Sequence, residues 1–552
     1  MLKQISILAI ISAMTLPAAA TAGPQQGKST EELSRRIEEL AHELDELKAQ
    51  LAKQGEQADG TAEEISGRME QVSGKVEGMN EKVAVMDSKV GEMEEKSAAM
   101  DWASRFKVHG DFRARFDAYS ASGADFFNLS TGQKESHDYS NDTMLTNRFR
   151  LNMEAKATEY VTFKGRLAMY KAWGMESYPR NDMNSWWPQF DGNSTRTPSD
   201  NALRVDRAFV NWTEIGGLPI WFSIGRRPTT DGPPAELRLG TGKKMATAAA
   251  YMDYPFDGLS LGYAYDWGND ALGTGLVRFC YGRGFESGLQ WDAAAFHEGT
   301  NIAPLDDTDF TGISWDVLTT ENRFLYLQSF AALNMFQRPA FLDDDFNADA
   351  NHTEGNIYHT STVYESRFKH FSYFAAGGWS RTDPGGSGMF NDYATASLMQ
   401  ADGSFSPNPD WQPNSSAENG FSLYAGLRYD IPDTGLKIGA EYNWGSQYWI
   451  AFNPGHDDMY LSKLATRGHV AELYMLYDLP TGEALSQYAK TYLRLGWQHY
   501  WYDYTGVDWN VRPYDLDDAQ LMTAYMMMAS EKGMLQPVDS ANQVYLTFDV
   551  FF

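Results

Sequence analysis

Basic side chains recur at alternate positions in several segments of the chain. In "FKVHGDFRARFDAY" (106–119), Lys107, Arg113 and Arg115 fall on one face of an extended strand, and apolar residues fall on the other. Successive side chains of a strand point to opposite faces, so several charges in succession would share one space. A soluble sandwich rarely allows this, whereas a barrel with water inside does. The chemistry expected of these residues is electrostatic, acting on charged solutes or ions in that water.

The same alternation assigns an inward face along the rest of the chain. The basic residues expected to line the interior are Lys107, Arg113, Arg115, Arg148, Arg150, Lys156, Lys164, Arg166, Arg207, Lys490 and Arg494. The inward acids are more dispersed: Asp111, Asp117, Glu154, Asp266, Asp292, Glu441, Glu472 and Asp478. Two interpretations are open. The basic residues form a ladder that faces acidic loops and creates a transverse field, or the charges pair locally, as Asp111 and Arg113 would.

Metal sites have weaker support. The segment "FLDDDFNADAN" (341–351) has the acidic spacing of a calcium loop but lacks the required Gly and the distal Glu, which favours a solvated acidic loop. The methionines of "DLDDAQLMTAYMMMASEKGM" (515–534) could suggest soft-metal binding, but they are more typical of residues that pack a loop helix. We therefore expect no metal and no cofactor.

Covalent catalysis is also disfavoured. His109, His297, His359 and His499 each lack a serine and a carboxylate that the sequence could tie to them, so we do not expect an enzyme. The single cysteine, Cys280, can form neither an internal disulfide nor a C-x-x-C-H haem attachment. The formal net charge of −28 disfavours binding to nucleic acid.

The connections between alternating segments fall into two classes. Eight short turns alternate strictly with nine long polar segments, which would join 18 strands, with 16 as the alternative count. Short turns on one side and long loops on the other are typical of outer-membrane barrels. No run of about 18 or more apolar residues is present, which excludes a transmembrane helix. The predicted fold is an all-β, transmembrane antiparallel β-barrel of about 18 strands over residues 102–552.

Outward faces support the same fold. Stripes such as Phe421-Leu423-Leu427 carry apolar residues at every second position, with Tyr and Trp collected at the stripe ends as in interfacial girdles. The chain ends on the alternating segment "QVYLTFDVFF" (543–552). We expect this segment to be the closing strand, which pairs with the first strand and leaves no edge unpaired.

The N-terminal part follows a different pattern. Residues 1–22 have the positive start, apolar stretch and Ala20-Thr21-Ala22 cleavage site of a signal peptide. Residues 23–101 carry apolar residues at alternating spacings of four and three, which predicts an α-helical coiled coil.

Two segments resemble those of a known class. The end "VYLTFDVFF" resembles the aromatic-ended signal recognised by barrel-assembly machinery, and "FKVHGDFRARFDAY" resembles the first strand of porin-like proteins with a periplasmic coiled coil. The chain thus resembles Gram-negative outer-membrane porins of a poorly characterised porin-like family. The resemblance implies an outer-membrane location, contact with lipid and lipopolysaccharide, recognition through Phe552, and a homotrimer held by a periplasmic coil.

The resemblance also suggests a constriction. The segment "TTDGPPAELRLGTGKKM" (229–245) occupies the place where porins often fold a loop into the barrel, with Arg238, Lys243 and Lys244 as its contacts. The expected function is passive diffusion of small hydrophilic solutes or ions. Weak selectivity is expected because acids at the mouth and bases on the wall nearly cancel. The alternatives are a sheath for an electron-transfer partner and an outer-membrane barrel enzyme.

Overall fold

The computed structural model describes most of residues 105–552 and scattered positions before them. Within 105–552 the undescribed positions are 129–130, 176–197, 228–231, 241–249, 287–305, 337–352, 400–404, 454–461, 483, 519–520, 524 and 527–535. The chain divides into two compact units, Met1–Lys107 and Val108–Phe552.

In the N-terminal unit, the described positions before Arg105 lie between residues 35 and 89, and all of them are helical. Arg35 and Glu39 approach to 3.6 Å, and His42 and Glu46 to 4.0 Å, one helical turn apart. Such exposed pairs add only about 0.3–0.5 kcal/mol to a helix. None of the helices in the described part of the chain has the length and apolar character needed to span a bilayer. The expected signal peptide, 1–22, lies outside the described residues.

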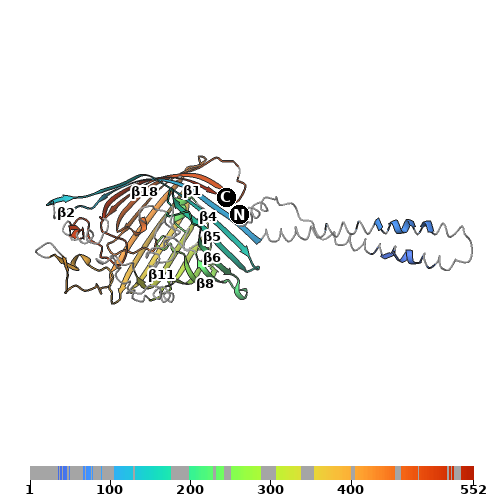
Figure 1. Ribbon diagram of the computed structural model, residues 1–552, viewed down its shortest axis with the longest axis horizontal. Helices are drawn as coiled ribbons and strands as arrows, with labels where there is room; N and C mark the ends of the chain where they lie inside the picture. The colour runs from blue at the N-terminus through green and yellow to red at the C-terminus, as the bar shows by residue number, and fades with distance from the viewer. Residues whose placement is uncertain are drawn as a thin grey trace, which may run out of the picture. The chain divides into compact units, whose positions relative to one another are not determined.

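The second unit is a closed antiparallel barrel (Figure 1). In its described residues the barrel has 16 strands. They are β1 (Phe106–Gly123), β4 (Asp138–Lys156), β5 (Val161–Ala172), β6 (Arg204–Trp212), β7 (Ile220–Arg227), β8 (Phe256–Asp266), β9 (Thr274–Phe285), β10 (Thr308–Thr319), β11 (Arg323–Phe336), β12 (Thr353–Phe368), β13 (Phe371–Pro384), β16 (Asn419–Asp430), β17 (Leu436–Gly445), β18 (Gly468–Asp478), β19 (Lys490–Tyr502) and β20 (Val538–Phe551).

Short elements decorate the connections. Two small hairpins lie in the long loops. They are formed by β2 (Phe126–Asn128) with β3 (Gln133–Glu135), and by β14 (Ser397–Met399) with β15 (Phe405–Pro407). The short helices are η3 (Ile215–Gly217), α4 (Ala235–Leu239), η5 (Tyr393–Thr395) and η6 (Lys463–Ala465). Long and short connections alternate around the barrel, but the connection between β8 and β9, which was expected to be a long one (268–273), is one of the short ones.

The count of 18 strands is wrong, and the alternative of 16 is confirmed. The expected turn at 255–258 overlaps the start of β8, and the described residues between Arg227 and Phe256 form no barrel strand before it. Gly258 is a residue type typical of turns, but a Cβ there would lie 2.1 Å from the carbonyl oxygen of Tyr281 on β9. A glycine is therefore needed here because β8 and β9 approach each other closely at this position. The other extra strand, at 289–297, falls outside the described residues.

The two faces of the wall follow the predicted alternation. Apolar side chains on the outward face are exposed, with Leu423 at 61%, Phe421 at 51% and Leu427 at 51%. The charged residues between them in sequence point inward, and Arg113 and Arg115 on β1 are almost fully buried there. A lipid-facing apolar surface on a closed barrel defines a transmembrane β-barrel.

The barrel closes where its first and last strands meet. In Figure 1 the blue strand β1 lies beside the red C-terminal strands. β1 pairs with β20 from Asp111↔Phe551 onward, and Gly110 and Phe552 exchange backbone hydrogen bonds of 2.9 and 3.0 Å. Inside the barrel, Arg113 Nε lies 2.6 Å from Asp549 Oδ1 across the same junction. Both backbone pairing and a buried ion pair therefore hold the closure.

Replacing Asp549 by asparagine tests this ion pair. Asp549→Asn leaves the buried Arg113 guanidinium without its carboxylate, which should lower the free energy of unfolding by about 3–5 kcal/mol. The measurement is urea unfolding of the folded barrel in detergent micelles. Asp410→Asn, at an exposed loop position, is the control and should change little. Equal stability of the two variants would show that the pair does not hold the closure.

Candidate functional site

The inner faces of β1, β4, β5 and β20 carry a cluster of arginines paired with aspartates. Arg148 and Arg150 on β4 both contact Asp111, at 3.3 and 2.8 Å. Arg115 contacts Asp117 at 2.8 Å. With the Arg113 pair, these contacts show local pairing of the basic residues, the second of the two interpretations left open by the sequence. The partner of Arg113 differs from the expected one because Asp549 reaches it only after the barrel closes.

A bulge places two further charges inside. Opposite Arg166 on β5, the register shifts by one residue on β6. Such a bulge puts two residues against one, so Asp206 and Arg207 both face Arg166. Asp206 is fully buried and accepts a hydrogen bond of 2.5 Å from Arg166, with Arg207 Nε at 3.6 Å. Asp206 was not among the expected inward residues, because strict alternation cannot reveal a bulge.

The remaining expected residues lie at different depths. Lys107 and Lys156 are exposed at the start of β1 and the end of β4. Lys164 contacts Glu154 at 3.3 Å and is partly exposed. Arg494 is fully buried, with its guanidinium 5.0 Å from the centre of the Tyr545 ring. Lys243 and Lys244 lie outside the described residues.

The connection between β7 and β8 enters the barrel. In strand order β7 and β8 lie on the opposite side from β16–β19. Yet the carbonyl oxygens of this connection accept hydrogen bonds from side chains of those strands. The donor–acceptor pairs are Arg428 to Leu237 at 2.8 Å, Lys490 to Gly240 at 2.7 Å, and Tyr492 to Leu239. The loop therefore crosses the interior and is fixed to the far wall.

The end of α4 explains why these carbonyls are available. The last carbonyl groups of a helix have no intrahelical partner. Gly240 ends α4 with φ 66°, a left-handed conformation that glycine adopts without strain. A Cβ at this position would lie 3.1 Å from Leu476 Cδ2 on the far wall. A glycine is thus required both for the turn and for the contact.

Two buried carboxylates receive cations from two loops. Glu441 on β17 and Glu472 on β18 both bind Lys463 of η6, with Nζ 2.5 Å from Glu472 Oε2. Arg238 of α4 lies 3.5 Å from Glu472 and 4.0 Å from Glu441. Tyr424 and Tyr545 each donate a hydrogen bond of 2.6 Å to one of the two carboxylates. Since a buried charge is costly unless it is paired and hydrogen-bonded, this cluster fixes both loops to the wall.

Apolar residues fill the other side of the interior. The inner faces of β11, β12, β13 and β16 pack against residues of the β7–β8 and β17–β18 connections. The buried members of this core are Leu237, Ala250, Tyr251, Phe324, Tyr326, Val363, Phe374, Ala376, Tyr424, Trp449 and Leu464. Water throughout the lumen was expected from the sequence, so this apolar core was missed. The large apolar residues on the inward face of β11–β13 could have indicated it.

Two long loops are joined to each other by Arg467. Its guanidinium donates to the carbonyl oxygens of Trp449 at 3.1 Å, Thr505 at 3.3 Å and Asp508. Burial lowers the pKa of Arg467 to about 10, so it stays charged at neutral pH. In the β19–β20 connection, Met522 is buried beside Tyr514 and Tyr525, as expected for a methionine that packs a loop helix.

In the described part of the chain, the candidate metal ligands and histidines are not brought together into one site. There, no group of three or more His, Cys, Asp or Glu is placed to hold a metal ion. His109 stacks on Tyr488, with ring centres 4.1 Å apart, and His499 Nδ1 lies 2.7 Å from Asn542 Oδ1. His359 is enclosed by aromatic rings of the core. The acidic segment 341–351 and His297 lie outside the described residues.

Fold and interior together define a transmembrane β-barrel with loops inserted into its lumen. Residues 138–552 match the family described as "Protein of unknown function (DUF3373)", and the chain belongs to this family. No curated protein sequence matches the chain.

Solved structures share the barrel architecture at low identity. The outer-membrane protein OmpT of Vibrio cholerae is 9% identical, with a TM-score of 0.39. The outer membrane channel DcaP of Acinetobacter baumannii is 9% identical, with a TM-score of 0.35, and Salmonella typhi OmpF in complex with daunomycin is 8% identical, with a TM-score of 0.35. Each match covers 81% of this chain and 97% of the other. No conclusion about function follows from similarity at this level.

The anchoring of α4 can be tested by removing its cation. Arg238→Gln removes from Glu441 and Glu472 the cation that α4 supplies and leaves them Lys463 of η6, so the β7–β8 loop should detach more readily. We expect a larger single-channel conductance in planar bilayers and a loss of a few kcal/mol of stability, below the full cost of about 3–5 kcal/mol for a broken buried pair.

Glu236→Gln is the matched control for this substitution. Glu236 lies on the same helix and is also buried, but as a carboxylate it cannot form an ion pair with Glu441 or Glu472. Its substitution should leave the conductance unchanged. Equal conductance of the Arg238→Gln variant and the native protein would mean that Arg238 does not hold the loop in the lumen.

Proposed function

We propose that this barrel is an outer-membrane channel for passive diffusion of small hydrophilic solutes or ions. The observation that carries the proposal is the β7–β8 loop, which crosses the lumen and faces a wall of charged residues. A loop fixed inside a barrel reduces the cross-section to one charged passage, and residues at a constriction act on every solute that passes. We propose the basic residues expected from the sequence as the lining of the passage, with Arg238 as the described residue of the constricting loop.

Local pairing limits the selectivity of such a passage. Each carboxylate near the arginines cancels much of their field, because opposite charges a few ångströms apart appear neutral beyond about 8 Å at physiological salt. Arginines nevertheless outnumber aspartates on the described inner faces of β1 and β4–β6. Acidic outer loops oppose this excess at the mouth. We therefore propose weak selectivity, with a small preference for anions at the constriction.

The sheath alternative has less support. A barrel that encloses an electron-transfer protein needs a lumen wide enough for that protein. Here the chain's own loops pack against the inner faces of β11–β13 and β16. A channel for small solutes requires only the space beside the charged wall.

The surplus charge on β4 offers a test of the channel. Arg148 and Arg150 share one carboxylate, Asp111, so Arg148→Gln removes a positive charge and leaves Asp111 paired with Arg150. The reversal potential in a salt gradient should shift towards cation preference, while the fold is retained. Arg381→Gln, at an exposed position at the outer end of β13, is the control and should not shift it. An unchanged reversal potential for both variants would exclude the charged wall from the conduction path.

We further propose that the helical segment 23–101 lies in the periplasm and holds three copies together, and that Phe552 is read by barrel-assembly machinery. The heptad spacing supports self-association, since a narrow apolar seam needs a copy of itself to cover it. Deletion of residues 29–101 should convert a trimer into monomers in detergent, as measured by light scattering, with the barrel still folded. A monomeric full-length protein with an intact helix would contradict the proposal.

A further inference from the structure

The backbone pairing of the barrel wall is interrupted between β9 and β10, although the two strands run side by side. All residues of both strands are described, and the two strands are neighbours in the closed barrel. Their ladder nevertheless contains one residue pair, Thr308↔Phe285, and an isolated bridge, Gly273↔Thr319, lies at the other end. By contrast, β11 and β12 pair along almost their whole length. The seam between β9 and β10 is therefore tied at both ends and not paired in between.

A side chain takes over one of the missing backbone contacts. Trp267 Nε1, just after β8, donates to the carbonyl oxygen of Val317 on β10 at 2.7 Å. Unpaired backbone groups at membrane depth are tolerated only where protein or a cavity covers them. An interruption of this kind thus calls for a lining other than lipid tails.

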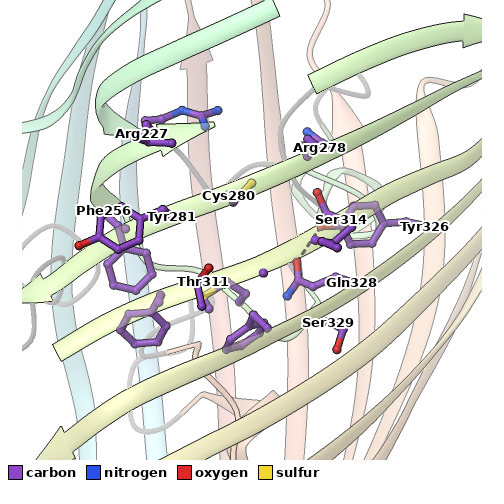
Figure 2. A pocket seen from close by; sticks show the side chains of 17 residues that line it. Arg227, Phe256, Arg278, Cys280, Tyr281, Thr311, Ser314, Tyr326, Gln328 and Ser329 are labelled. Carbon is purple, nitrogen blue, oxygen red and sulfur yellow. Dashed lines mark hydrogen bonds between the residues drawn. The ribbon is translucent and has the colours of Figure 1, made fainter. Parts of the chain in front are cut away.

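A cavity of about 100 Å³ occupies this seam (Figure 2). Five consecutive residues of β10, 310–314, line it, together with 280–282 of β9. Since successive residues of a strand point to opposite faces, a cavity lined by such runs reaches both faces of the wall. A volume well above the about 10–15 Å³ needed for one water can hold part of a hydrocarbon chain.

The lining combines apolar rings with a cation. Phe256, Phe310 and Phe330 contribute aromatic surface, and Arg227 reaches the cavity from the end of β7. Among the described residues no carboxylate pairs with Arg227, and its Nε has no hydrogen-bond partner. The second arginine of the lining, Arg278, is paired with Asp316 and contributes little net charge.

We propose that this cavity binds a single-chain anionic amphiphile, with its head group on Arg227 and its chain among the phenylalanines. A guanidinium with no carboxylate beside it among the described residues matches an anionic head group. An apolar pocket with a few polar groups that fix orientation is typical of small-molecule sites. The seam gives such a molecule a route from the bilayer, because the cavity reaches the outward face beside Ile313, which is 58% exposed. The site does not depend on conduction through the lumen.

Binding of radiolabelled decanoate to the full-length protein in phosphatidylcholine nanodiscs tests the site. We expect one saturable site in each chain. Arg227→Gln should weaken binding about tenfold or more, as for the loss of a hydrogen bond to a charged group. Arg227→Lys keeps the charge and should bind more tightly than the glutamine variant. Arg381→Gln, which removes an arginine far from the seam, should bind like the native protein.

Cys280 provides a second measurement, because it is the only cysteine and lines the cavity. Decanoate should slow alkylation of Cys280 by N-ethylmaleimide in the native protein, whereas decanol, which lacks the charge, should not. Heat-dependent gel mobility identifies folded barrels, so that only folded variants are compared. The absence of saturable decanoate binding, or equal binding by the native and Arg227→Gln proteins, would overturn the proposal.

Discussion

Closure of the barrel is the constraint on which the rest of the structure depends. In a bilayer every backbone polar group needs a partner within the protein, and a sheet meets this demand only when its edges join. Here β1 and β20 join along their length, and the Arg113–Asp549 pair sits on the inner side of the junction. Closure also brings the charges of β1 and β4 next to those of β19 and β20. The electrostatics of the lumen are thus a product of topology.

The lumen is organised by a second constraint, the cost of burying charge. Loops that enter the barrel bring cations, and the wall supplies carboxylates at the same depth. Glu441 and Glu472 therefore fix Arg238 and Lys463 from two different connections. On the other side of the lumen, aromatic packing holds the loops against the wall without charged groups. The loops are held by a polar contact on one flank and an apolar core on the other.

The interrupted seam between β9 and β10 shows where the wall departs from the rule of full pairing. Most of the other described ladders pair the backbone along the strands, but here a hydrogen bond from Trp267 and a cavity take the place of pairing. A departure of this kind in a lipid-facing wall is expected at a functional position, since it costs stability that pairing would otherwise supply. The amphiphile site proposed in the wall is thus separate from the passage proposed through the lumen.

The sequence by itself determined the barrel, its inward and outward faces, the alternation of long and short connections and the closing strand, because a period of two and turn composition are local properties. It also placed Arg238 on a loop that enters the lumen, by resemblance. Only the tertiary structure decided the count of 16, since Gly258 reads as a turn but serves a close approach of strands. The partners of Arg113 and Arg238, the bulge at Asp206 and the apolar half of the lumen were likewise beyond the sequence. Each depends on contacts between segments far apart in the chain, which no local pattern records.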